Sequence, residues 1–221
     1  MNLNQTGTHS LDYQKWTTKV LKLALLSYFL FRTFLRIIGS YIALDLSYVA
    51  MGMFTYIQAP VRTPFFELPI HHQVILTWLH QLGAFAVINF PYQVGAFVAV
   101  ATGSQSPDDW PPLFGNLSDA STVGRAWGRT WHQLLRRPLG ILTPHMQKWL
   151  GASSRPAKRT VSLFCSFAMS GISHWSGAFN IPWTPTAHGM FSYFMMQAPV
   201  IRMEDYVVEW GKARGIKSSS R

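Results

Sequence analysis

Cysteine and charged residues are both scarce in this 221-residue sequence. Charged residues make up 13% of the chain and hydrophobic residues 48%, a composition shifted away from that of an ordinary soluble protein. The single Cys165 excludes an intramolecular disulfide and is most simply a small packing residue. The polar stretch 2–18 has no compact apolar core followed by a cleavage site, so it does not look like a secretory signal.

The charges are unevenly distributed along the chain. Apart from histidines and tyrosines, the ionisable residues between Ile37 and Thr102 are Asp45, Arg62 and Glu67. Residues 125–159 alone hold eight basic residues. This layout is typical of apolar spans joined by basic loops.

Four apolar stretches approach the roughly 20 residues that a membrane-spanning helix needs. They are Ile37–Ile57, Gln73–Ala101, Thr160–Phe179 and Ala187–Val208. The second contains Pro91, which predicts a kink or a break there. Upstream, Lys19–Arg36 is apolar but carries cations, which fits an interfacial helix or the tilted start of the first span. We therefore predict an all-α polytopic membrane protein with about four to five transmembrane helices and an amphipathic or re-entrant helical loop.

Basic residues also predict the orientation, because short loops rich in Lys and Arg stay in the cytosol. Five basic residues lie at 15–36, one between the first two spans, eight between the second and third, and four after Trp210. Both termini and the loop 103–159 are therefore expected to be cytosolic, and Gly211–Arg221 to be a disordered basic tail. Without a recognised fold or a basic-aromatic patch, the net charge of +10 does not favour nucleic-acid binding.

The predicted cytosolic loop has two halves. Residues 103–115 are rich in turn formers, and Pro111 with Pro112 excludes a helix there. Beyond them, Ser118 is a plausible N-cap for a helix that carries an aromatic stripe. Pro138 and Gly140 would end this helix. The stripe consists of Val123, Trp127 and Trp131 at spacing four. One interpretation is an interfacial helix, and the other is a cytosolic entrance where arginines meet the phosphates of a nucleotide-bearing donor.

His174 lies deep in the third predicted span, where an ionisable group is costly and usually faces a bundle interior or a water-filled cavity. Ser170, Ser173 and Gly177 leave room around it for close packing or for a ligand. It is either a neutral histidine bonded to a neighbouring helix or a general base, since a neutral imidazole suits removing a proton from a hydroxyl. We predict no metal site, because no other histidine or carboxylate stands at ligand spacing.

Three ordered stretches resemble the wax-synthase-like branch of the membrane-bound O-acyltransferases, especially its fungal members. They are DWPPLFGNLSDASTVGRAWGRTWHQLLRR (109–137), SLFCSFAMSGISHWSG (162–177) and MMQAPVIRMED (195–205). The resemblance implies that His174 is the general base and that His132 polarises the thioester or positions the donor. Trp127, Arg129 and Trp131 would shape the donor region, with Ser170 and Ser173 as further substrate contacts.

The resemblance also implies a reaction. An acyl group, acetyl in many fungal relatives, would move from acyl-CoA to the hydroxyl of a hydrophobic alcohol such as a terpenoid. Acyl-CoA is then a co-substrate and no cofactor is bound. We expect a single domain over residues 1–221, with 103–159 as its donor-side loop, in the endoplasmic reticulum membrane.

The chain departs from the family in length, since members usually run to about twice its size. We therefore expect a shortened member, and oligomerisation could supply missing walls of a tunnel. Two alternatives stay open. One is a non-catalytic scaffold or paralogue, and the other is a membrane terpene cyclase that uses Asp45 or Asp109 as its acid.

Overall fold

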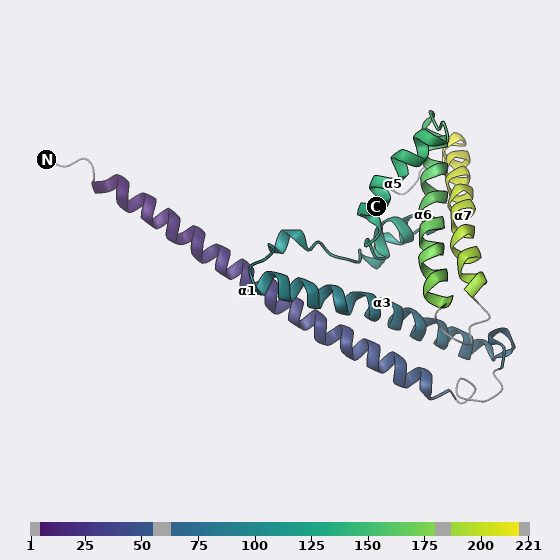
Figure 1. The fold of residues 1–221 in the computed structure, drawn as a ribbon, viewed down its shortest axis with the longest axis horizontal. Coiled ribbons are helices and arrows are strands. Elements are labelled where there is room, and N and C mark those ends of the chain that lie inside the picture. The colour runs from purple at the N-terminus through teal and green to yellow at the C-terminus, as the bar shows by residue number, and fades with distance from the viewer. Residues whose placement is uncertain (1–4, 55–62, 180–186, 217–221) are drawn as a thin grey trace. The chain divides into compact units, whose positions relative to one another are not determined.

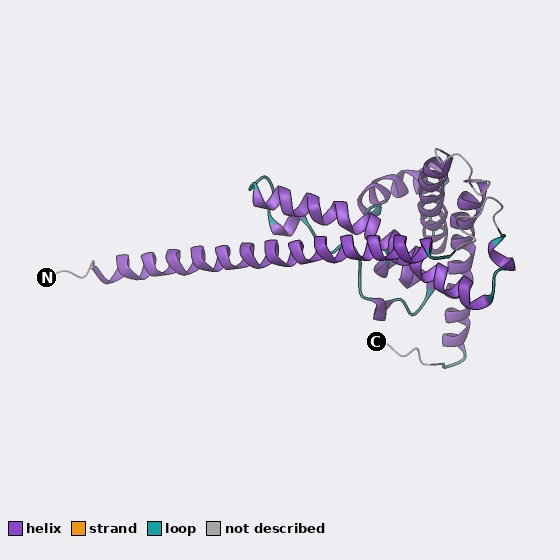
Figure 2. Cartoon of the chain, turned by 90° about the horizontal axis from the view of Figure 1, so that it is seen from below, coloured by secondary structure: helices purple, strands orange, loops and turns teal. Residues whose placement is uncertain are grey.

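The computed structural model describes residues 5–54, 63–179 and 187–216, which form helices and turns without a strand (Figures 1 and 2). The long helices are α1 (Gln5–Gly52), α3 (Ile70–Ala101), α5 (Arg136–Trp149), α6 (Arg155–Phe179) and α7 (Ala187–Ala213). Short helical pieces lie between them: η1 (Phe65–Glu67), η2 (Pro107–Asp109), η3 (Leu117–Asp119), α4 (Val123–Arg125) and the π-helix η4 (Ala126–Thr130). The predicted all-α class is confirmed. The chain divides into two compact units, Met1–Pro112 and Leu113–Arg221.

In the first unit, α1 and α3 run antiparallel along a seam of small and polar side chains (Figure 1). Thr33, Ser40 and Ser47 recur every seven residues on α1 and are at most 3% exposed. The amide Nδ2 of Asn89 on α3 donates to Ser40 Oγ at 2.8 Å. Gly83 lets the helices approach closely, since a Cβ there would lie 3.0 Å from Ser47 Oγ. Small and hydrogen-bonding residues at a helix interface are typical of helix pairs in membranes.

Large apolar side chains point away from this seam. Exposed examples on the two helices are Phe31, Leu35, Ile42 and Leu46 on α1, and Val74, Trp78, Val87 and Val98 on α3. The unit thus buries polar groups and exposes apolar ones, the reverse of a water-soluble helix pair. Among the described residues, one helix, α3, is long and apolar enough to cross a membrane.

The predicted spans are all helical where they are described, but their limits differ from the predictions. The expected interfacial helix Lys19–Arg36 and the first span form one continuous helix, because nothing at the junction of Arg36 and Ile37 breaks it and lysine and arginine are good helix formers. Residues 55–57 of that span lie outside the described residues. Helix α3 does not break at Pro91, since it packs on α1 on both sides of the proline. Helices α6 and α7 extend several residues beyond the predicted third and fourth spans.

Residues 103–112 form the expected turns and lie back along α3. Gly103 has a φ of 70°, which glycine adopts without strain. The hydroxyl of Tyr92 donates to the carbonyl oxygen of Pro111 at 2.6 Å, and its ring meets Trp110 with centroids 5.0 Å apart. Gly95 makes room for Trp110, because a Cβ there would lie 3.2 Å from the indole.

In the second unit, α6 and α7 pack around a small apolar core (Figure 1). Its buried members are Phe167, Phe194, Ala198 and Ile201. Gly171 permits the close approach of the two helices, because a Cβ there would lie 2.9 Å from the ring of Phe191. Helix α5 packs on α6, and Gln147 Nε2 donates to Ser162 Oγ at 2.9 Å.

The helix predicted from Ser118 to Pro138 forms only in part. Ser118 lies inside η3, and Thr122 is the N-cap, accepting from the Arg125 amide at 3.1 Å. The helix widens into the π-helix and ends at Thr130. Pro138 does not end a helix but lies in the first turn of α5, where its missing N–H has no intrahelical partner to lose. Of the predicted disordered tail, residues 211–213 continue α7 and residues 217–221 lie outside the described residues.

Candidate active site

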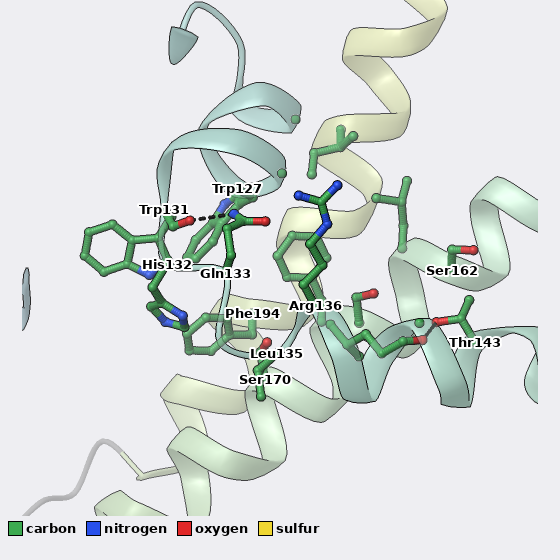
Figure 3. Close-up of a pocket in the computed structure, with 18 of the residues that line it drawn as sticks. Trp127, Trp131, His132, Gln133, Leu135, Arg136, Thr143, Ser162, Ser170 and Phe194 are labelled. Atoms are coloured by element: carbon green, nitrogen blue, oxygen red, sulfur yellow. Dashed lines mark hydrogen bonds between the residues drawn. The ribbon is translucent and has the colours of Figure 1, made fainter. Parts of the chain in front are cut away.

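The second unit contains a cavity of about 540 Å³ that α4, η4, α5, α6 and α7 line together (Figure 3). This volume is typical of small-molecule sites. His174 and His132, 42 residues apart in sequence, both line it. The fold therefore brings together the two histidines that the sequence singled out.

His174 reaches the cavity from α6 as the last member of a polar stripe at spacing four. The stripe consists of Ser162, Ser166, Ser170 and His174, and all four line the cavity. The imidazole of His174 stacks on the ring of Phe194, with centroids 4.4 Å apart and planes 11° apart. No described residue hydrogen-bonds this imidazole, so the expectation of a structural bond to a neighbouring helix is not met within the described chain. Stacking fixes the ring and leaves its nitrogens for a ligand.

His132 follows the π-helix and Trp131 (Figure 3). Its Nδ1 is buried and has no hydrogen-bond partner among the described residues. Burial lowers the pKa of His132 below the ordinary value of 6.5, and the nearby His174 lowers it further because two imidazolium ions would repel each other. His132 is therefore neutral at pH 7, with one ring nitrogen able to donate to a ligand.

Trp127 anchors the segment that carries His132. Its indole N–H donates to Gln197 Oε1 on α7 at 3.1 Å. Its ring packs edge-on against Phe167 on α6 and at a tilt of 59° against Phe194 on α7, each with centroids 5.7 Å apart. The aromatic stripe therefore contacts the protein core, which differs from the interfacial interpretation of the stripe.

Glu204 on α7 holds the start of the same segment. Its two carboxylate oxygens accept from the backbone N–H groups of Val123 and Gly124, at 2.6 and 2.9 Å. A carboxylate at a helix N-terminus satisfies unpaired donors and favours the helix dipole. This role was not predicted, because a contact between positions about 80 residues apart leaves no local signal in the sequence.

Two backbone hydrogen bonds between the antiparallel stretches 113–115 and 130–133 hold the C-terminal end of this segment. The amide of Gly115 donates to the carbonyl of Thr130 at 3.0 Å, and that of Gln133 donates to Leu113 at 3.0 Å. Gly115 is required by this close approach, because a Cβ there would clash with the carbonyl oxygen of Arg129. The segment from Val123 to Gln133 is thus fixed at both ends.

The remaining predicted site residues are distributed differently. Trp127, Trp131 and Ser170 line the cavity. Arg129 lines a neighbouring groove instead. Ser173 is exposed, is not a lining residue of either cavity, and donates to the Met169 carbonyl at 2.9 Å.

Several polar residues of the cavity were not predicted. They are Gln133, Thr143, Gln147, Ser162 and Ser166. Ser162 and Ser166 could have been predicted, because they stand four residues apart in a run of serines that ends at His174. No pattern in the sequence predicted the lining residues of helix α5, because Pro138 and Gly140 suggested that helical structure ends there. The described residues contain no group of three or more histidine, cysteine or acidic side chains that could hold a metal ion.

Comparison with known proteins finds a family that is similar to the part of the chain around this cavity. Residues 110–196 match the membrane bound O-acyl transferase family. This segment contains both histidines and much of the cavity, and over it the chain is similar to that family. The resemblance seen in the sequence is confirmed at the family level.

The relatives found are fungal. The chain is 39% identical to the acetyltransferase ple2 of Rhodocybe pseudopiperita over 127 residues, which are 56% of this chain and 33% of that protein. It is 31% identical to the acetyltransferase sirH of Leptosphaeria maculans over 156 residues, 69% of this chain and 38% of that protein. It is 33% identical to the O-mevalon transferase yanI of Aspergillus niger over 109 residues, 44% of this chain and 24% of that protein.

The chain therefore spans about a third of the length of the first two relatives. No solved structure matches it.

Proposed function

We propose that this chain carries the reaction centre of an acyl-CoA:alcohol O-acyltransferase. The observation that supports this most is the meeting of His132 and His174 in one cavity, within the segment that matches the family. Acetyl is the proposed acyl group, because relatives are named acetyltransferases. Acetyl-CoA is then the co-substrate.

In the proposed reaction His174 is the general base. Its neutral imidazole takes the proton from the acceptor hydroxyl as that oxygen attacks the thioester carbonyl carbon. The C–S bond then breaks, the ester forms, and the imidazolium returns the proton to the departing thiolate of CoA. The stacking on Phe194 holds the ring in one orientation through both proton transfers.

His132 is proposed to stabilise the negative charge that develops on the thioester oxygen. This role needs a hydrogen-bond donor in a site with little water. A neutral His132 supplies one, and its buried Nδ1 has no partner among the described residues that would compete for it. Trp127 and Trp131 would shape the donor side of the cavity, and Ser170 the acceptor side.

The acceptor is proposed to be a hydrophobic alcohol of fungal secondary metabolism, such as a terpenoid. The cavity supports this class because its wall combines aromatic and aliphatic side chains with a few hydroxyl and amide groups. Other relatives are named O-mevalon transferases, so acyl-CoA donors other than acetyl-CoA belong in the test of the proposed acyl group.

The proposed setting is the endoplasmic reticulum membrane, with the loop 103–159 on the cytosolic side. The outward apolar faces of α1 and α3 support a place in a bilayer. We also propose that α1, α6 and α7 are embedded with α3.

The test is ester formation from labelled acetyl-CoA and a panel of terpenoid and polyketide-derived alcohols in microsomes that contain the protein. His174→Ala is expected to lower the rate by a factor of about 10²–10⁴. His145→Ala is the matched control, because His145 is an exposed histidine of the same unit and does not line the cavity. Equal rates for wild type and His174→Ala would reject the proposal.

A null result across all donors and acceptors would favour the non-catalytic scaffold. The cyclase alternative has less support from the structure, because Asp45 is exposed on α1 and Asp109 accepts hydrogen bonds from Ser106 within a turn. Loss of turnover in Asp45→Asn but not in His174→Ala would nevertheless revive it.

A further inference from the structure

Phe194 on α7 is an aromatic residue that both histidine-bearing segments share. One face of its ring carries the imidazole of His174, with centroids 4.4 Å apart and planes 11° apart. The same ring contacts Trp127, in the segment that carries His132, with centroids 5.7 Å apart. Phe194 is only 6% exposed and belongs to the apolar core of the unit. The ring is therefore fixed by its packing and lies directly against the proposed base.

The chemistry proposed for His174 creates a positive charge next to this ring. The inference rests on that proposed function, in which the proton of the acceptor hydroxyl moves to the imidazole and makes it an imidazolium ion. That proton then passes to the departing thiolate of CoA. The imidazolium ion therefore exists only during the transfer, and a group that stabilises it raises the rate.

The wall of the cavity offers this ion no counter-ion within the described ranges. In the serine hydrolase triad, a buried carboxylate stabilises the imidazolium that the histidine base becomes. Among the described residues that line this cavity, none is acidic. The other ionisable side chains of the lining are Arg136 and His132, neither of which carries a negative charge. Stabilisation of the ion by this part of the chain must then come from a neutral group.

An aromatic face is a neutral group that attracts a cation. The π-electrons make the faces of the ring negative, and a cation over a face within about 6 Å of the centroid is drawn to it. This attraction is larger where water is excluded. His174 fits the geometry, since its imidazole lies almost parallel to the buried ring of Phe194 at 4.4 Å. A neutral imidazole gains less from such a face than an imidazolium ion does, so the contact favours the charged form.

We infer that the face of Phe194 stabilises the imidazolium ion that His174 becomes during acyl transfer. Phe194 acts through His174, so it is a positioning residue with an electrostatic role. This role goes beyond fixing the orientation of the imidazole, because it makes the rate depend on the charge distribution of the ring as well as on its shape.

The experiment replaces Phe194 in the full chain by phenylalanines that carry one, two or three fluorine atoms on the ring. Fluorine withdraws charge from the ring face and changes the shape of the ring little. The first turnover is timed by rapid quenching at increasing concentrations of labelled acetyl-CoA, with purified protein in lipid nanodiscs and an alcohol that wild type acetylates. The maximal rate should fall with each added fluorine, to about a tenth of the wild-type rate with three.

The dependence on acetyl-CoA separates this role from a change in binding. The concentration that gives the half-maximal rate should stay at the wild-type value, because the imidazolium ion is absent before the transfer begins. Phe194→Leu keeps an apolar side chain and has no π-face. It should be at least as slow as the protein with three fluorine atoms.

Phe191 is the matched control for the fluorinated rings. It lies one turn earlier on α7 and packs close to Gly171 of α6, but it does not line the histidine cavity. The same three rings at position 191 should leave the maximal rate unchanged.

Three results would overturn the inference and leave the proposed transfer intact. The first is a wild-type rate throughout the series at Phe194. The second is an equal fall in the series at Phe191, which would indicate a general effect of fluorine on the helix pair. The third is a raised half-saturating concentration at an unchanged maximal rate, because Phe194 would then only shape the binding site.

The proposed function fails in a different way. If wild type acetylates no alcohol, or if His174→Ala is as fast as wild type, the acyl transfer by His174 is rejected and the inference with it. If His174→Ala is slow while the fluorinated rings at Phe194 are not, only the role of Phe194 is rejected.

Discussion

The two units of this chain use buried polar groups in opposite ways. In Met1–Pro112, Asn89 donates to Ser40, and Gln93 donates to Asn89 in turn, so these amides and hydroxyls join helices. In Leu113–Arg221, the stacked His174 and the buried Nδ1 of His132 face a cavity without a protein partner among the described residues. Polar groups that satisfy one another stabilise a fold, whereas groups left to a cavity can act on a ligand. The first unit is thus a helix pair joined by polar contacts, and the second holds the proposed reaction centre.

The largest expected effect comes from Gly115→Ala, which tests whether the second unit depends on the close approach of 113–115 to 130–133. The added methyl would clash with the carbonyl oxygen of Arg129. We expect the second unit to lose about 3 kcal/mol of stability, as for an overpacked site. Thermal unfolding of the purified protein measures this loss.

Gly140→Ala is the control for that variant. A Cβ at Gly140 meets no heavy atom within 4 Å, and Gly140 lies inside α5. Alanine there should stabilise the helix by about 0.5–1 kcal/mol. If both alanine variants shift the unfolding midpoint in the same direction, the close approach does not control the stability of this unit.

The next effect in size is that of Glu204→Ala, which leaves two backbone N–H groups without their acceptor. A loss of about 1–3 kcal/mol follows from the unpaired donors. The rate of ester formation should fall as well, because the segment that carries Trp127 and His132 loses one of its attachments.

Glu209→Gln is the comparison for Glu204. Both acids lie on α7 and line the same groove as Arg129, but only Glu204 binds the N-terminus of α4. Glu209→Gln should keep the stability and the rate of wild type. An equal effect of the two substitutions would mean that charge, and not the attachment, is what matters at Glu204.

Sequence patterns could predict the long helices other than α5 and the place of His174 inside one of them, because these rest on local signals, whereas His132 was singled out only through the family resemblance. Apolar runs placed the helices, and the spacing of Trp127 and Trp131 placed an aromatic stripe on one face. The continuity of α1 through Arg36, and of α3 through Pro91, could not be predicted, since packing between helices decides both. The Glu204 attachment and the pairing of 113–115 with 130–133 join distant positions, and a single sequence contains no record of such contacts.

A smaller effect is expected in the first unit. Asn89→Ala removes the bond to Ser40 and should destabilise the α1–α3 pair by about 0.6–2 kcal/mol, the range for hydrogen bonds between membrane helices. Thr77→Ala is the control, because its hydroxyl bonds only to Gln73 on its own helix. The acetylation rate of the protein that remains folded should equal that of wild type in both variants. A specific loss of rate in folded Asn89→Ala would show that the first unit takes part in the reaction.

The smallest effect is a dependence of stability on pH that comes from His132. Burial lowers the pKa of His132 in the folded protein, so the unfolded chain binds more protons as pH falls below about 6.5. Stability should therefore decrease below that pH and be fully present above it. In His132→Asn this part of the decrease should vanish, as shown by unfolding midpoints at several pH values. Parallel pH curves for the two proteins would contradict the burial of His132.

The most direct test of a shared reaction centre is a double-mutant cycle on the rate of acetyl ester formation. It uses wild type, His132→Ala, His174→Ala and the double variant. Because groups that act together on one reacting bond are strongly non-additive, the double variant should be no slower than the slower single variant. Losses that multiply, or a His174→Ala variant as fast as wild type, would contradict the account.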